Sequence, residues 1–197
     1  MGLIKKVLKI IRLKMNKKDI FFYKGKIILG ENVKFNQRLI LKKDEKVKGG
    51  KITIGNNCSF GYEYGGGFND SKIEIQIRGI GAEIKISNNV ATNNNLFICA
   101  KKLVEIENDC LIGRNVTIMD HNAHGISPNK RRTSSGTAKE IKIEENVWIG
   151  NNVIILPGTK IGKNSIVGAG SVLKGVYPKN VIIQGNPAKI IKNIEEI

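Results

Sequence analysis

The two histidines of the chain lie three residues apart in a polar stretch, and they are the first candidates for chemistry. His121 and His124 follow Asp120 and flank Asn122. An imidazole titrates near neutrality, so either ring could accept a proton and later return it, as general acid–base catalysis requires. The elements around this stretch must therefore hold an imidazole in place.

A repeat of six residues surrounds the histidines and predicts those elements. Ile, Val or Leu occupies every position at this spacing: Ile106, Ile112, Ile118, Ile143, Ile149, Ile155, Ile161, Val167 and Leu173. A period of six is neither helical nor a simple strand alternation, but it fits a short strand, a turn and the next strand. Three hexads then form one coil of a triangular solenoid, with the aliphatic side chains inside and Gly or Asn at turns of positive φ.

Interruptions of the repeat mark the candidate functional segments. Weaker hexads occur upstream of residue 106, and the stretches 38–51 and 62–83 break the period, the second as an excursion or as a longer, irregular coil. The largest break, 119–142, contains both histidines, and a polar loop of this length inside a tight solenoid is usually functional. We expect a basic arm at 1–26, a solenoid domain at 27–190 and a tail at 191–197.

Charge is concentrated at the start of the chain. The 197 residues contain 33 Lys and Arg against 17 Asp and Glu, and half of the excess of +16 lies in residues 1–26. Apolar residues in 3–15 follow a helical stripe, so this arm could lie on an anionic membrane surface or pack against the body or a sister subunit. Lysine outnumbers arginine and aromatic residues make up only 6%, which does not favour nucleic-acid binding.

The remaining composition bounds the cellular context. Three cysteines without metal-ligand spacing predict reduced thiols, and no apolar run is long enough to span a membrane. We therefore expect a cytoplasmic protein, with peripheral contact at the inner membrane face as one interpretation of the arm.

Several motifs together resemble the left-handed β-helix, or hexapeptide-repeat, acetyltransferases, in particular the galactoside, maltose and streptogramin group and its surface-polysaccharide relatives. The motifs are the hexads, the histidine loop and four short runs: Asn146-Val147-Trp148-Ile149-Gly150, Pro157-Gly158, Gly168-Ala169-Gly170-Ser171 and Gly185-Asn186-Pro187-Ala188. The resemblance is strong over 106–193, weaker over 27–105 and absent over 1–26. It implies an all-β left-handed parallel β-helix and a homotrimer that binds acetyl-CoA between two solenoids, uses no metal and acetylates a sugar hydroxyl.

The resemblance also implies roles for the loop residues. The segment from Asp120 to Ile126 is similar to a family pattern that places the general base at His124, with His121 as the second candidate. Gly125 stands where relatives have proline. Asp120 and Asn122 could orient an imidazole, bind sugar hydroxyls or form an ordinary turn.

The donor side follows by the same correspondence. The resemblance implies that Trp148 lines the donor groove, that the backbone N–H of Asn151 serves the oxyanion, and that Gly168 and Ala169 lie at the pantetheine. Lys189 and Lys192 match basic positions near the adenosine phosphates. Lys174 is one place earlier than the corresponding lysine of the relatives, which leaves its phosphate role open.

The sequence therefore favours an acetyl-CoA-dependent O-acetyltransferase for a sugar or a surface-polysaccharide precursor. Two alternatives remain open, a sugar-nucleotide N-acetyltransferase and a non-catalytic β-helix scaffold that binds membrane or an acidic partner. A zinc carbonic anhydrase of the same fold needs three histidine ligands, and the chain has two.

Overall fold

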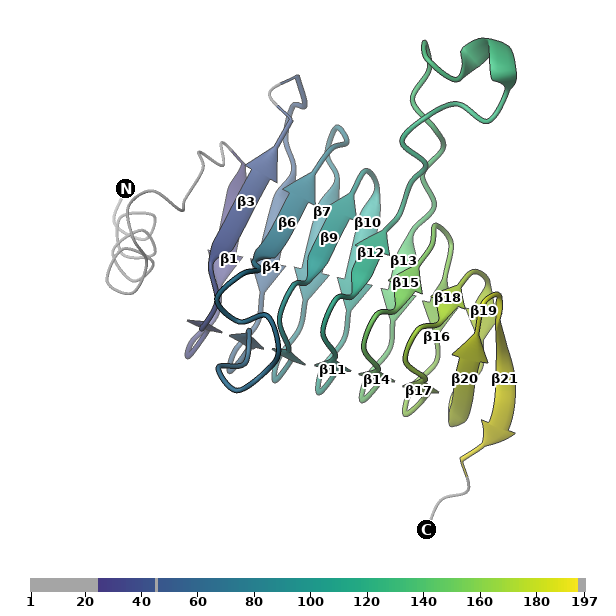
Figure 1. Ribbon diagram of the computed structural model, residues 1–197. Coiled ribbons are helices and arrows are strands. Elements are labelled where there is room, and N and C mark those ends of the chain that lie inside the picture. The colour runs from purple at the N-terminus through teal and green to yellow at the C-terminus, as the bar shows by residue number, and fades with distance from the viewer. Residues whose placement is uncertain (1–24, 45, 195–197) are drawn as a thin grey trace.

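The protein is a left-handed parallel β-helix, as the hexads predict. The computed structural model describes residues 25–44 and 46–194. Three parallel sheets form the sides of a triangular solenoid, and the chain passes through them in turn (Figure 1). The arm expected at 1–26 lies almost wholly outside the described residues. Within the described ranges, no helix is long and apolar enough to cross a membrane.

Successive coils add one strand to each sheet in turn, until the last coil ends in the second sheet, where β21 is added antiparallel to β20. The first sheet contains β1 (Lys26–Leu29), β4 (Lys51–Ile54), β7 (Glu83–Ile86), β10 (Leu103–Ile106), β13 (Ile141–Ile143), β16 (Lys160–Ile161) and β19 (Val176–Tyr177). The second contains β2 (Lys34–Phe35), β5 (Ser59–Phe60), β8 (Ala91–Thr92), β11 (Leu111–Ile112), β14 (Trp148–Ile149), β17 (Ile166–Val167), β20 (Val181–Gly185) and β21 (Ala188–Asn193). The third contains β3 (Leu39–Lys43), β6 (Ile73–Ile77), β9 (Phe97–Ala100), β12 (Thr117–Met119), β15 (Ile154–Ile155) and β18 (Val172–Leu173). The first corner joins the first sheet to the second, the second corner joins the second to the third, and the third corner leads back to the first.

The aliphatic residue of each hexad points into the solenoid. All nine hexad positions are at most 3% exposed. Parallel pairing stacks them on one another, for example Ile112 on Ile149 and Ile149 on Val167. This confirms the predicted inward row, and its burial is the main hydrophobic contribution to stability.

Asparagine forms the turns, also as predicted. Among the described residues, ten other than glycine have positive φ, and nine of them are asparagine. At the first corner these side chains hydrogen-bond from coil to coil, as from Asn89 to Asp109 at 2.9 Å and from Asn146 to Asn164 at 3.0 Å. Each turn residue thus tolerates the positive φ angle that the turn requires, and its side chain links two coils.

The breaks in the repeat have two different structures. Residues 73–77 form a regular strand, β6, so only 61–72 leaves the coil, at the second corner. The histidine loop leaves at the third corner, between β12 and β13, and contains the short 3-10 helix η1 (Pro128–Lys130). β21 turns back antiparallel to β20 and crosses the expected boundary at residue 190, so residues 191–193 of the expected tail are strand.

One inward position tests the hydrophobic core. Thr92 stacks between Phe60 and Ile112, and within the described part of the chain its buried hydroxyl has no hydrogen-bond partner. Because an unpaired buried hydroxyl is costly, we expect Thr92→Val to stabilise the protein by about 1 kcal/mol and to raise Tm by about 2–4 °C. The matched control is Thr159→Val, because the Thr159 hydroxyl donates to the carbonyl oxygens of Leu156 (2.7 Å) and Leu173 (3.1 Å). Calorimetric melting of both variants checks this, and a lower Tm for Thr92→Val would contradict it.

Candidate active site

The histidine loop rises from the third corner on a short antiparallel stem (Figure 1). His121 and Ala138 form an antiparallel β-bridge. The N–H of Asn122 donates to the carbonyl of Thr137 at 3.1 Å, and the N–H of Lys139 donates to the carbonyl of Asp120 at 2.8 Å. These contacts place the stem at residues 120–122 and 137–139. The loop therefore has a fixed root and an exposed outer part.

Asp120 anchors that root. Its carboxylate is fully buried and accepts the backbone N–H groups of Lys101 (2.8 Å), Lys102 (2.7 Å) and Leu103 (2.9 Å). It also contacts Nδ1 of His121 at 2.9 Å. Of the roles that the sequence left open for Asp120, these contacts support orientation of an imidazole, and full burial leaves no surface for a sugar hydroxyl.

The two imidazoles differ in accessibility. His121 is 3% exposed, whereas His124 is exposed. Nδ1 of His124 lies 3.1 Å from the carbonyl oxygen of Arg131. Because a carbonyl only accepts hydrogen bonds, Nδ1 carries a proton, and in the neutral ring Nε2 then presents the lone pair that a general base requires. His124 thus combines a base-competent tautomer with access to a substrate.

Most of the predicted donor-side residues gather on another part of the coil. Trp148 lies on β14 of the second sheet with 54% of its surface exposed, and Asn151 and Ala169 lie exposed on successive turns of the second corner. Lys189 and Lys192 lie on β21, which extends the same sheet. Gly168 lies beside Ala169, but a Cβ at Gly168 would come within 2.9 Å of the Gln184 side chain, so this glycine is also needed for packing. Lys174 instead follows β18 at the third corner, on the histidine side.

The backbone of Asn151 offers a hydrogen-bond donor. At two places on the second corner a side-chain amide oxygen of the next coil accepts a backbone N–H: Asn94 Oδ1 accepts that of Tyr62 at 2.9 Å, and Asn151 Oδ1 accepts that of Arg114 at 2.8 Å. Ala169 occupies the corresponding place in the next coil and has no such oxygen. Among the described residues, the N–H of Asn151 accordingly has no partner, and it is free to bind an oxyanion.

One chain therefore contains two separated half-sites. Figure 1 shows the histidine loop rising from one edge of the solenoid, whereas β11, β14 and β17 lie along the opposite edge. The third sheet lies between the third corner and the second corner. One hexad of extended chain spans about 20 Å, which sets the distance between these two corners. The structure brings Trp148, Asn151, Gly168 and Ala169 together, but it does not bring them to His124.

The thiols take no evident part in this site. All three cysteines are buried and unpaired. Burial raises the pKa of Cys99 to about 12 and that of Cys110 to about 11, so neither is a nucleophilic thiolate at neutral pH. No group of three His, Cys, Asp or Glu side chains suited to a metal ion occurs within 25–44 and 46–194.

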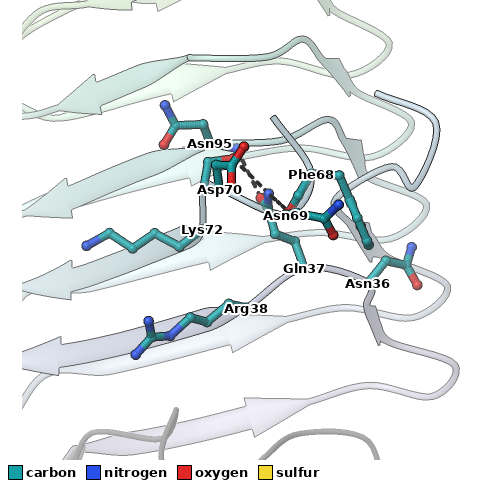
Figure 2. A pocket seen from close by; sticks show the side chains of 9 residues that line it. Asn36, Gln37, Arg38, Phe68, Asn69, Asp70, Lys72 and Asn95 are labelled. Carbon is teal, nitrogen blue, oxygen red and sulfur yellow. Dashed lines mark hydrogen bonds between the residues drawn. The ribbon is translucent and has the colours of Figure 1, made fainter. Parts of the chain in front are cut away.

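Two surface hollows flank the excursion at 61–72, and sequence reasoning missed most of their residues. One, of about 360 Å³, adjoins Trp148 and Asn151 and also includes Tyr62, Asn93 and Leu111. The other, of about 550 Å³, lies around Gln37, Arg38, Phe68, Asp70 and Lys72 (Figure 2). The aromatic residues of the excursion are the available signal, but the position of Tyr62 beside Trp148 depends on how the coils stack.

Family models match two segments of the chain. The model described as bacterial transferase hexapeptide (six repeats) matches residues 140–175, and the hexapeptide repeat of succinyl-transferase matches residues 103–127. Both segments fall on the hexads, on either side of the outer part of the histidine loop.

Whole-chain comparisons extend the match. A galactoside O-acetyltransferase of Lactococcus lactis is 32% identical over 166 residues, which cover 83% of this chain and 74% of that protein. A putative lipopolysaccharide biosynthesis O-acetyl transferase of Escherichia coli is 43% identical over 120 residues, which cover 55% of this chain and 60% of that protein. The crystal structure of the polySia-specific acetyltransferase NeuO aligns with a TM-score of 0.58 and 26% identity, covering 92% of this chain and 83% of that one.

The anchoring role of Asp120 gives a prediction. Asp120→Ala removes the acceptor of three backbone N–H groups, so we expect a loss of about 3 kcal/mol in the free energy of unfolding and faster tryptic cleavage at Lys130–Arg132. The control is Asn122→Ala, because the Asn122 side chain is exposed and makes no hydrogen bond within the described structure, so its loss should change stability by less than about 0.5 kcal/mol. Urea denaturation and timed proteolysis measure both, and equal stability of the two variants would argue against the anchor.

Proposed function

Because the chain belongs to the hexapeptide-repeat acetyltransferase family, we propose that it transfers an acetyl group from acetyl-CoA to a hydroxyl of a sugar or of a surface-polysaccharide precursor. The observation that carries the proposal is the pair of half-sites: an exposed imidazole whose Nδ1 is bound to a carbonyl, and a backbone N–H at Asn151 that has no partner among the described residues. The similarity to a galactoside O-acetyltransferase supports a hydroxyl acceptor.

The chemistry assigned to these groups is direct transfer. Acetyl-CoA supplies an acetyl group activated as a thioester. His124 Nε2 accepts the proton of the acceptor hydroxyl while the hydroxyl oxygen bonds to the thioester carbonyl carbon. The N–H of Asn151 donates to the oxygen that becomes negative, and the imidazolium returns its proton to the thiolate as the carbon–sulfur bond breaks. No acyl-enzyme forms, in keeping with the buried thiols.

The separation of the half-sites supports a homotrimer with shared sites. His124 and Lys174 lie at the third corner, whereas Trp148, Asn151 and Ala169 lie at the second sheet and second corner. In a closed ring of three chains, the third corner of one copy can face the second corner of the next, and every site is then completed in the same way. Acetyl-CoA would lie in that groove, with Lys189 and Lys192 near its phosphates.

The proposal also includes where in the cell the protein acts. We place it in the cytoplasm, where acetyl-CoA would be available to it. The basic arm at 1–26 would bring it to an anionic membrane face that carries a lipid-linked acceptor. Packing of the same arm on a sister subunit is the alternative.

Removing the base tests the chemical role. We expect His124→Ala to lower kcat by about 100- to 10,000-fold, because the hydroxyl loses its proton acceptor, and to leave the Kd for CoA within about twofold. Asn129→Ala, on the exposed 3-10 helix of the same loop, is the control and should keep parental activity. Calorimetric titration with CoA and a coupled assay with galactoside acceptors measure both quantities. Unchanged kcat in His124→Ala, or transfer to amino sugars but not to hydroxyls, would overturn the assignment.

Mixed oligomers test the shared site. His124→Ala lacks the base but keeps an intact groove, and Ala169→Trp fills the groove but keeps the base. If each site uses His124 of one chain and Ala169 of another, random co-assembly makes about one quarter of the sites active, although each variant alone is inactive. Co-expression with two affinity tags, followed by the transfer assay, gives the answer. Mixed oligomers without recovered activity would place both halves in one chain.

A further inference from the structure

The excursion at 61–72 has a shape fixed by two buried amides. The Asn94 side chain is fully buried, and its Nδ2 donates to the carbonyls of Tyr62 (3.0 Å), Gly65 (3.0 Å) and Gly66 (3.3 Å). Its Oδ1 also accepts the N–H of Tyr62 at 2.9 Å. Buried and fully bonded amides of this kind hold a loop rigidly.

Gln37 holds the other half of the same loop. Its Nε2 donates to the carbonyl of Phe68 at 2.9 Å and contacts Ser71 Oγ at 2.8 Å (Figure 2). Its Oε1 accepts the N–H of Asn95 at 3.1 Å. The two amides come from the coils on either side, so the excursion is part of the rigid body.

The excursion nevertheless keeps aromatic rings in solvent. Tyr62 is 54% exposed and Tyr64 is 85% exposed, and their rings lie 5.8 Å apart, edge to face. Large rings held rigidly at a surface are characteristic of binding sites, because they offer wide apolar contact at little cost in conformational entropy.

Only one of these tyrosines faces the reaction site. The hollow of about 360 Å³ lies between the excursion and the second sheet. The larger side chains that line this hollow are aromatic rings, an aliphatic group and amides: Asn36, Tyr62, Asn93, Leu111, Trp148 and Asn151. Tyr64 does not line it. Leu111 and Trp148 pair in register on neighbouring strands, and both line it.

The hollow suits a neutral sugar and not the donor's phosphates. Among the described residues that line it, none is charged. Phosphates require cations, whereas a pyranose offers an apolar C–H face to aromatic rings and hydroxyls to amides. The cations of the donor side, Lys189 and Lys192, lie in the opposite direction along the solenoid, on β21.

The hollow also begins where the reaction is proposed to occur. The second-corner turns at Tyr62, Asn93, Gly113 and Asn151 follow one another in the stack of β5, β8, β11 and β14. Three steps between stacked strands span about 14 Å. A glycan whose hydroxyl attacks a thioester carbonyl held at the Asn151 N–H would therefore extend over Leu111 toward Tyr62.

We propose that the excursion at 61–72 is the acceptor-binding element of this transferase, and that Tyr62, with Trp148 and Leu111, binds an uncharged pyranoside of the acceptor in this hollow. The inference rests on the proposed acetyl transfer and adds the acceptor class and its site. Tyr62 determines specificity and takes no part in proton transfer.

The lone tryptophan gives a direct binding signal, because Trp148 is the only one in the chain and lines the hollow. We would titrate the full-length protein, saturated with CoA, with methyl β-galactoside and with maltose, and follow Trp148 fluorescence. Steady-state acetylation of the same sugars gives the KM of acceptor and donor separately. We expect Tyr62→Ala to weaken sugar binding and raise the acceptor KM about tenfold or more, with the acetyl-CoA KM within twofold.

Two further variants distinguish the loss of the Tyr62 ring from a general disturbance of the excursion. Tyr62→Phe keeps the ring and should bind sugar nearly as the parent does. Tyr64→Ala removes a more exposed ring of the same loop that lies outside the hollow, and should match the parent in both KM values.

The proposal is overturned if Tyr62→Ala leaves the acceptor KM unchanged or raises both KM values equally. It is also overturned if neither sugar alters Trp148 fluorescence, or if an oligosialic acid probe binds in a Tyr62-dependent way. Failure of the proposed function looks different, because then CoA itself does not alter Trp148 fluorescence and no acetyl group is transferred to any sugar.

Discussion

The positive φ angle of one residue at every first corner is the constraint on which the solenoid depends. All seven first corners in the described part of the chain carry it, six on asparagine and one on Asp109. Most residues pay about 1–2 kcal/mol for this conformation, whereas Asn and Asp tolerate it through local hydrogen bonds. Because the angle repeats, each coil returns in register, and the aliphatic residues of successive hexads stack into one core.

The third corner is free of this constraint, and the histidine loop is inserted there. Its residues of positive φ are glycines, among them Gly81, Gly158 and Gly175, and the length of its turns differs from coil to coil. An insertion at this corner therefore breaks no asparagine ladder. The buried carboxylate of Asp120 supplies the link that a ladder would otherwise give, because it holds the turn of the preceding coil and the loop together.

The sequence predicts features that repeat locally, and predicts less well those that depend on stacking. The inward positions and the asparagine turns follow from the hexad alone, since every copy has the same neighbours. The break at 62–83 was ambiguous because Ile73–Ile77 is a regular strand displaced by a twelve-residue excursion, a displacement that the period does not encode. The separation of His124 and Lys174 from Trp148, and the approach of Tyr62 to Trp148, depend on which corner each residue occupies in three dimensions.

Departures from the repeat coincide with the positions to which we assign function, because the regular repeat satisfies its own hydrogen bonds. Where an asparagine could accept this N–H, as Asn151 does for Arg114, Ala169 leaves the N–H of Asn151 without an acceptor among the described residues. An asparagine there would add a hydrogen bond between coils but would occupy the N–H that we assign to the oxyanion. At 61–72 the opposite holds, because Gln37 and Asn94 replace the lost turn bonds and the excursion keeps its shape. One departure thus leaves a polar group open for chemistry, and the other builds a rigid wall beside it.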